Sequence, residues 1–143
     1  MLLKKMAMIG SVLMVSALPV AAFADLETCN QTLDTPSTVK ITSGVLHPCS
    51  SSFPPGITYP GTCLTKTIAQ VRAACGIVKG PCSADIYVTA DCNASGAAPV
   101  GHVAIQINQT TITIASASVE DPAKYAIDLA GGPTPRITIR KVG

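Results

Sequence analysis

The sequence predicts an α+β fold, a mostly antiparallel β-sheet or small sandwich that carries one helix and is stapled by disulfides. Three observations support this fold class. Short runs of alternating apolar and polar residues recur through the second half of the chain. One segment, residues 65–75, has apolar side chains at helical spacing. Six cysteines occur in a chain of 143 residues, of which only 13% are charged.

Residues 1–24 have the features of a secretory signal peptide. A pair of lysines precedes an apolar stretch, which ends at the small-residue cleavage pattern Ala22-Phe23-Ala24. We therefore expect cleavage before Asp25 and a single secreted domain over residues 25–143. The leader is of bacterial type, so the mature chain is expected in the periplasm or outside the cell. No later apolar run reaches membrane-spanning length, and no membrane association is expected after cleavage.

The charge of the chain excludes several classes of partner. Ten basic and eight acidic residues give a net charge of +2, and two of the lysines lie in the predicted leader. The mature chain is therefore close to neutral, which argues against nucleic acid or an anionic membrane as its target.

Neither a zinc-ligand spacing nor a glycine-rich phosphate loop is present in the sequence, so we expect no metal and no cofactor.

All six cysteines follow the predicted cleavage site. An even number of cysteines in a small exported chain indicates a disulfide framework. The residues concerned are Cys29, Cys49, Cys63, Cys75, Cys82 and Cys92.

The pairing of these cysteines can be predicted from the elements between them. Two cysteines at opposite ends of the helix, or of the strand that follows it, lie too far apart for a disulfide, which needs Cα atoms within about 7 Å. If that strand folds back antiparallel to the helix, the cysteines at each end of the two elements meet. The predicted disulfides are therefore Cys75–Cys82, Cys63–Cys92 and, for the remaining pair, Cys29–Cys49.

The segment before the helix gives weaker signals. Residues 25–36 show no clear period, and residues 38–46 are predicted to form a strand. Residues 47–61 hold four prolines and are predicted to form a loop. This loop carries Phe53 and Tyr59, which either form a contact surface, if exposed, or tuck under the loop and cover the core.

The predicted helix over residues 65–75 has one apolar face. Thr65 is suited to cap its start, and Gly76 is suited to the left-handed conformation at its end. Lys66 and Arg72 lie off the apolar face and are expected in solvent. The apolar face consists of Leu64, Ile68, Val71 and Cys75.

Most strands are predicted after the helix. Arg136 and Arg140 share one face of the last predicted strand. They either bind an anionic ligand or prevent an edge strand from pairing with other chains. The predicted elements are a strand over residues 84–90, a hairpin over 101–119 that turns at Asn108-Gln109, a short strand over 125–129 and a final strand over 136–142.

The sequence offers few groups for catalysis. His47 and His102 are the two histidines, and each could work as an acid or base with a nearby carboxylate. Ser50-Ser51-Ser52 lies near His47 but lacks the sharp turn of a nucleophile elbow. We assign no catalytic residue. The expected function is a non-enzymatic binding or effector module for an unknown protein or envelope ligand, and the alternative is a small secreted hydrolase using His47 or His102.

The run from Cys75 to Asn93, with Cys75-Gly76 and Pro81-Cys82 near its start and Cys92 at its end, resembles small exported cysteine-containing bacterial proteins with no characterised activity. The resemblance implies export and disulfide bonds. It assigns no role to any further residue.

Overall fold

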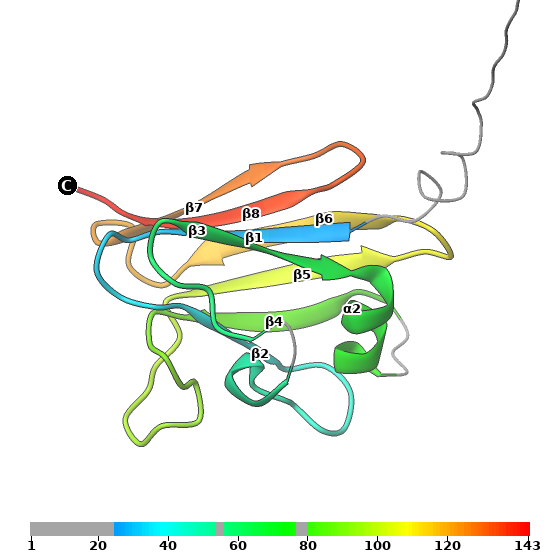
Figure 1. Cartoon of the computed structure of the whole chain (residues 1–143), viewed down its shortest axis with the longest axis horizontal. Helices are drawn as coiled ribbons and strands as arrows, with labels where there is room; N and C mark the ends of the chain where they lie inside the picture. The colour runs from blue at the N-terminus through cyan, green and yellow to red at the C-terminus, as the bar shows by residue number, and fades with distance from the viewer. Residues whose placement is uncertain (1–24, 54–55, 77–79) are drawn as a thin grey trace, which may run out of the picture.

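Two four-stranded sheets face each other, and a short helix at one end connects them (Figure 1). The computed structural model describes residues 25–53, 56–76 and 80–143, so the predicted signal peptide lies outside the described residues. The predicted fold class, a mostly antiparallel sandwich with one α-helix and disulfides, is confirmed. Within the described ranges, no helix is long and apolar enough to cross a membrane.

The first sheet has the strand order β3-β1-β8-β7. Its β1 strand is antiparallel to β3 and parallel to β8, so segments from the two halves of the chain meet at its centre. The strands are β1 (Asp25–Gln31), β3 (Thr62–Thr67), β7 (Tyr125–Ala130) and β8 (Arg136–Lys141).

β1 lies in the stretch that shows no sequence period. The reason is that its buried positions are partly polar. Asn30 is fully buried, and its amide group donates to the carbonyls of Thr35 and Thr58 while its Oδ1 accepts from the backbone and hydroxyl of Thr32. Hydrogen bonds satisfy this side chain, so burial there needs no apolar residue.

The second sheet is antiparallel throughout, in the order β2-β4-β5-β6. The predicted hairpin is confirmed as β5 and β6, with a β-bulge opposite the step from Ala104 to Ile105. The strand predicted over 38–46 ends earlier, and the strand predicted over 84–90 is shifted toward the N-terminus. The strands are β2 (Thr38–Ile41), β4 (Cys82–Tyr87), β5 (Gly101–Ile107) and β6 (Ile112–Val119).

The helix α2 (Ile68–Cys75) begins later than predicted. The preceding residues extend β3 instead, because every second residue from Thr62 to Thr67 carries its side chain to the same face of the sheet and the backbone pairs with β1. Thr67, not Thr65, caps the helix in a capping box with Gln70. Gly76 ends the helix, as predicted, at a positive φ of 69°, but its ψ of -154° differs from that of the left-handed helical conformation expected there. A 3₁₀ turn, η3 (Ser50–Ser52), lies in the predicted loop.

The two sheets come close together where Gly101 of β5 lies beside the side chain of Ile127 of β7. A Cβ atom added at Gly101 would lie 2.5 Å from Cδ1 of Ile127 and 3.0 Å from the carbonyl oxygen of Ser118. Only glycine therefore permits this approach of the sheets without rearrangement. The core between the sheets is aliphatic and includes Leu26, Ile41, Ile86, Val103, Ile105, Ile137 and Ile139.

Three disulfides link the elements, and one of them follows the prediction. Cys75–Cys82 joins the end of α2 to the start of β4, as expected. The predicted pairs Cys63–Cys92 and Cys29–Cys49 are wrong: the structure pairs Cys29 with Cys63 and Cys49 with Cys92. The error has a physical cause, because the prediction packed β4 on the helix and overlooked β1. β1 pairs with β3 and brings the Cα atoms of Cys29 and Cys63 to 4.0 Å.

Candidate functional site

A cavity of about 60 Å3 lies between the two sheets, beside α2. Its walls are mainly aliphatic and come from both sheets and the helix. Polar groups enter from one side, where Thr28 of β1 and Thr58 of the loop before β3 have their hydroxyl oxygens 3.5 Å apart. The aliphatic lining includes Leu26, Val39, Val71, Ile86, Ile105 and Ile139.

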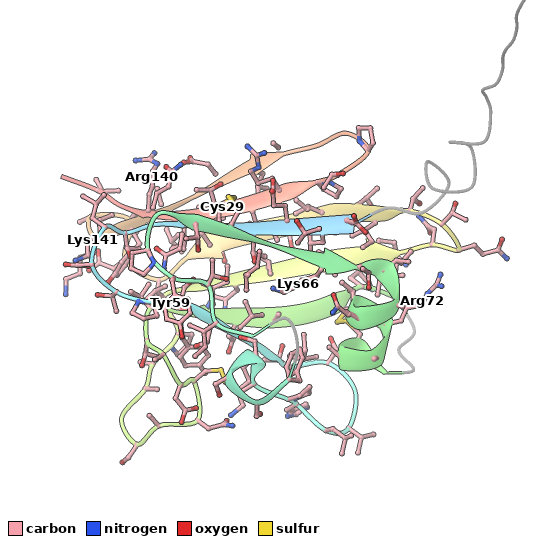
Figure 2. All side chains as sticks on the ribbon, in the orientation of Figure 1. Cys29, Tyr59, Lys66, Arg72, Arg140 and Lys141 are labelled. Carbon is pink, nitrogen blue, oxygen red and sulfur yellow. A yellow bond between two sulfur atoms is a disulfide. The ribbon has the colours of Figure 1, made fainter. Side chains whose placement is uncertain are left out.

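Lys66 of β3 projects into this space between the sheets (Figure 2). Its register partner on β1 is the buried Leu26, so both side chains belong to the inward face of the first sheet. Only 8% of the Lys66 surface is exposed, which corrects the expectation that Lys66 is solvated. The expectation failed because it treated this residue as helical, whereas alternation along a strand turns it inward.

The ammonium group of Lys66 has little compensation for its burial. Its Nζ donates to Oγ1 of Thr28 at 3.2 Å, and among the described residues no carboxylate lies within ion-pair distance of it. Burial lowers the pKa of Lys66 to about 8, because desolvation disfavours the charged form. A perturbed titratable group in an apolar cavity is a physical mark of a functional site.

Arg72, the other cation of the predicted helix, is exposed as expected. Its guanidinium donates to the carbonyls of Asn108 and Gln109, at 2.5 and 2.8 Å. Figure 2 shows Arg72 pointing outward from α2, away from Lys66. This contact ties the helix to the turn between β5 and β6, so the two cations have different roles.

His102 forms a second cluster of titratable groups, on the outer face of the second sheet. Its Nδ1 lies 2.7 Å from Oδ1 of Asp85 on β4, and its Nε2 contacts Oε2 of Glu120, which follows β6. Hydrogen bonds to Glu120 and then to Asp85 raise the pKa of His102. An open depression of about 290 Å3 beside it is lined by Ser83, Ser116 and Ser118, among others.

This cluster is poorly arranged for hydrolysis. Both ring nitrogens of His102 face carboxylates, so neither is free to accept a proton from a serine. The raised pKa also favours the imidazolium, which is a donor and not a base. His47 lies elsewhere, in the exposed turn after β2, with its Nε2 3.1 Å from the carbonyl oxygen of Gly44. His102 therefore serves as an electrostatic link between strands.

The Glu120→Gln variant is expected to lower the pKa of His102, and Asp121→Asn, which changes a neighbouring carboxylate, is expected to leave it unaltered. NMR titration of the His102 ring protons measures both. Because the folded pKa is raised, the stabilisation from this cluster is fully present below about pH 6.5 and is lost as the pH rises through the folded pKa. Equal titration midpoints in wild type and Glu120→Gln would contradict the assignment.

The four residues predicted as a possible binding surface occupy different places. Phe53 is half-buried and lines the cavity, whereas Tyr59 is 57% exposed. Arg136 and Arg140 each pair with a carboxylate, through Nε to Glu27 and to Asp128, both at 2.6 Å. The suggestion that these arginines protect an edge is wrong, because β8 lies between β1 and β7.

One close group of possible metal ligands occurs in the described part of the chain, formed by Glu27, Cys29 and Cys63. Its two sulfurs are joined in a disulfide and offer no thiolate. Glu27 is already paired with Arg136. The group therefore lacks the donor chemistry of a metal centre.

The fold and the cavity together define a disulfide-linked β-sandwich with an apolar, lysine-containing space between its sheets. A similar solved structure is that of the Legionella pneumophila type II secretion system substrate NttC, with a TM-score of 0.56 and 22% sequence identity. The match covers 83% of this chain and 98% of that one, which shows a shared fold. No protein-family model matches the chain, and no curated protein is significantly similar to it in sequence.

Proposed function

We propose that this chain is an exported, disulfide-stabilised bacterial protein that acts as a non-enzymatic binding module and holds a small ligand between its sheets. The observation that carries the proposal is the buried, unpaired ammonium of Lys66 in an aliphatic cavity. A group that is costly to bury is retained more readily where a ligand compensates for it.

Export is supported by three disulfides, which form in oxidising compartments, and by the leader-like sequence of residues 1–24. The similar fold of NttC, a type II secretion substrate of Legionella pneumophila, makes secretion by that route part of the proposal. The test is expression in a bacterium with an intact or a deleted type II system. Equal amounts of the chain in both culture media would oppose this route.

The cavity favours a small envelope-derived or environmental molecule over a protein as the ligand, because about 60 Å3 of space between two sheets holds only a few non-hydrogen atoms. The alternative, a secreted hydrolase that uses His47 or His102, is less well supported. The two histidines have separate surroundings, and both nitrogens of His102 face carboxylates.

The binding function is tested by titrating the protein with hexanoate and with hexan-1-ol and observing the methyl groups of the cavity by NMR. At least one probe is expected to give saturable shifts in the wild type. Ala74 lines the cavity whereas the adjacent Ala73 is exposed, so Ala74→Leu fills the cavity and Ala73→Leu is its matched control. Ala74→Leu is expected to weaken binding about tenfold or more, since added methyl groups occupy the ligand's space.

Two results would refute the binding function. One is the absence of saturable shifts with both probes. The other is equal affinity in Ala74→Leu and Ala73→Leu, with both variants shown to be folded by their methyl spectra and by three intact disulfides.

A further inference from the structure

We propose that the ligand is a short organic anion, a carboxylate attached to an apolar tail, whose carboxylate pairs with the ammonium of Lys66. This inference deepens the proposed function and rests on it. It assigns the chemical class of the ligand from the one charged side chain of the cavity and from the chemistry of the walls around it.

The first argument is charge. An ammonium group has three N–H donors, and the hydrogen bond observed for Lys66 goes to the hydroxyl of Thr28. Lys66 is the only charged residue that lines the cavity in the described part of the chain, and the cysteines there are held in disulfides. A ligand that brings one negative charge therefore neutralises the site, whereas a cationic ligand would add to an uncompensated positive charge.

The second argument is the position of the hydroxyl groups. Oγ1 of Thr28 is 3.2 Å from Nζ of Lys66 and 3.5 Å from Oγ1 of Thr58. The ammonium and two hydroxyl groups thus form one polar end in a cavity whose other walls are mainly aliphatic, with Ser37, Gln70 and Phe53 as the exceptions. A carboxylate has two oxygens and accepts several hydrogen bonds at once, so it can use the ammonium and a hydroxyl together.

The third argument is size. A water molecule needs about 10–15 Å3 of volume by the same kind of measure, and the cavity offers about 60 Å3. The cavity therefore takes a ligand of about four to six carbon atoms in all, the carboxylate carbon included. The walls also include Val71 of α2 and Ile105 of β5, which offer no polar partner in their side chains. The ligand's tail must be apolar to replace water there.

The inference is tested by calorimetric titration with hexanoate and hexan-1-ol, which share a six-carbon chain and differ in charge. At pH 7 the wild type is expected to bind hexanoate about tenfold or more tightly than hexan-1-ol, because couplings measured for close, desolvated charge pairs correspond to a factor of ten and more. Lys66→Met is expected to lose this preference. Lys124→Met, which removes an exposed lysine outside the cavity, is expected to keep it.

The pH dependence gives an independent readout. Because the pKa of Lys66 is about 8, hexanoate binding is expected to weaken about tenfold from pH 7 to pH 9 in the wild type. Hexan-1-ol binding, and all binding to Lys66→Met, are expected to change little over that range.

The outcomes separate the two proposals. Equal binding of hexanoate and hexan-1-ol, or a preference that survives in Lys66→Met, would overturn the ligand class and leave a cavity that binds neutral molecules. Absence of binding by both probes would overturn the ligand class and the binding function together. Preference for hexanoate that disappears only in Lys66→Met would support both.

Discussion

Lys66→Met is expected to stabilise the protein by about 3 kcal/mol at pH 7 in the absence of ligand. Burial lowers the pKa of Lys66 from 10.5 to about 8, and each unit corresponds to about 1.4 kcal/mol. Methionine has a similar length and no charge, so it fills the same space without the desolvation penalty. Urea unfolding at pH 7 measures the difference, and Lys124→Met, at an exposed position, is expected to change stability by less than about 0.5 kcal/mol.

The sign of this effect also fixes its pH dependence. Between pH 8 and 10.5 the unfolded chain binds a proton at Lys66 that the folded chain does not, so wild-type stability rises with pH in that window. The advantage of Lys66→Met should therefore shrink by about 2 kcal/mol between pH 7 and 9.5. A variant that is less stable than wild type at pH 7 would show that Lys66 contributes more through its hydrogen bond and stem than burial costs.

Removing the Cys49–Cys92 disulfide is expected to cost about 4 kcal/mol, and removing Cys75–Cys82 about 2 kcal/mol. The difference follows from the sequence separations, 43 and 7 residues, since a longer closed loop restricts the unfolded chain more. Paired serine substitutions and urea unfolding measure both values. A larger loss from the pair Cys75→Ser and Cys82→Ser would contradict the loop-length explanation.

The same reasoning applies to complete reduction. The three disulfides together contribute as much as the whole free energy of unfolding of a small domain. Dithiothreitol is therefore expected to unfold the protein at physiological temperature. Equal melting temperatures with and without the reductant, after confirmed reduction of all six cysteines, would refute this expectation.

The strands β4 and β5 that follow α2 could be predicted because burial alternates along most of their length. In β5, Val103 and Ile105 face the core while His102 and Gln106 are partly exposed, which gives the period of two that identifies a strand. β1 lacked that signal, because Asn30 is buried through hydrogen bonds and not through an apolar side chain. Once β1 was missed, the partners of Cys29 and Cys63 could not be predicted correctly.

The candidate site could not be predicted for a related reason. Lys66 lies where a strand passes into a helix, and the apolar spacing of Ile68 and Val71 continues back far enough to suggest one longer helix. One signal did favour a strand: Thr62, Thr65 and Thr67 are β-branched residues that suit a sheet. If residues 62–67 are taken as a strand, Leu64 and Lys66 lie on the same face of the sheet, and Lys66 is then expected to point toward the core.

The pairing of β1 with β8 has a consequence for the order in which the chain folds, if it is exported as proposed. Residues 25–31 and 136–141 are neighbours at the centre of the first sheet, so the amino-terminal strand has no β8 partner until the last strand has emerged from the translocation channel. Contacts between such distant segments form slowly. A chain that emerges from its amino-terminal end therefore completes this sheet only when its last strand is free to pair.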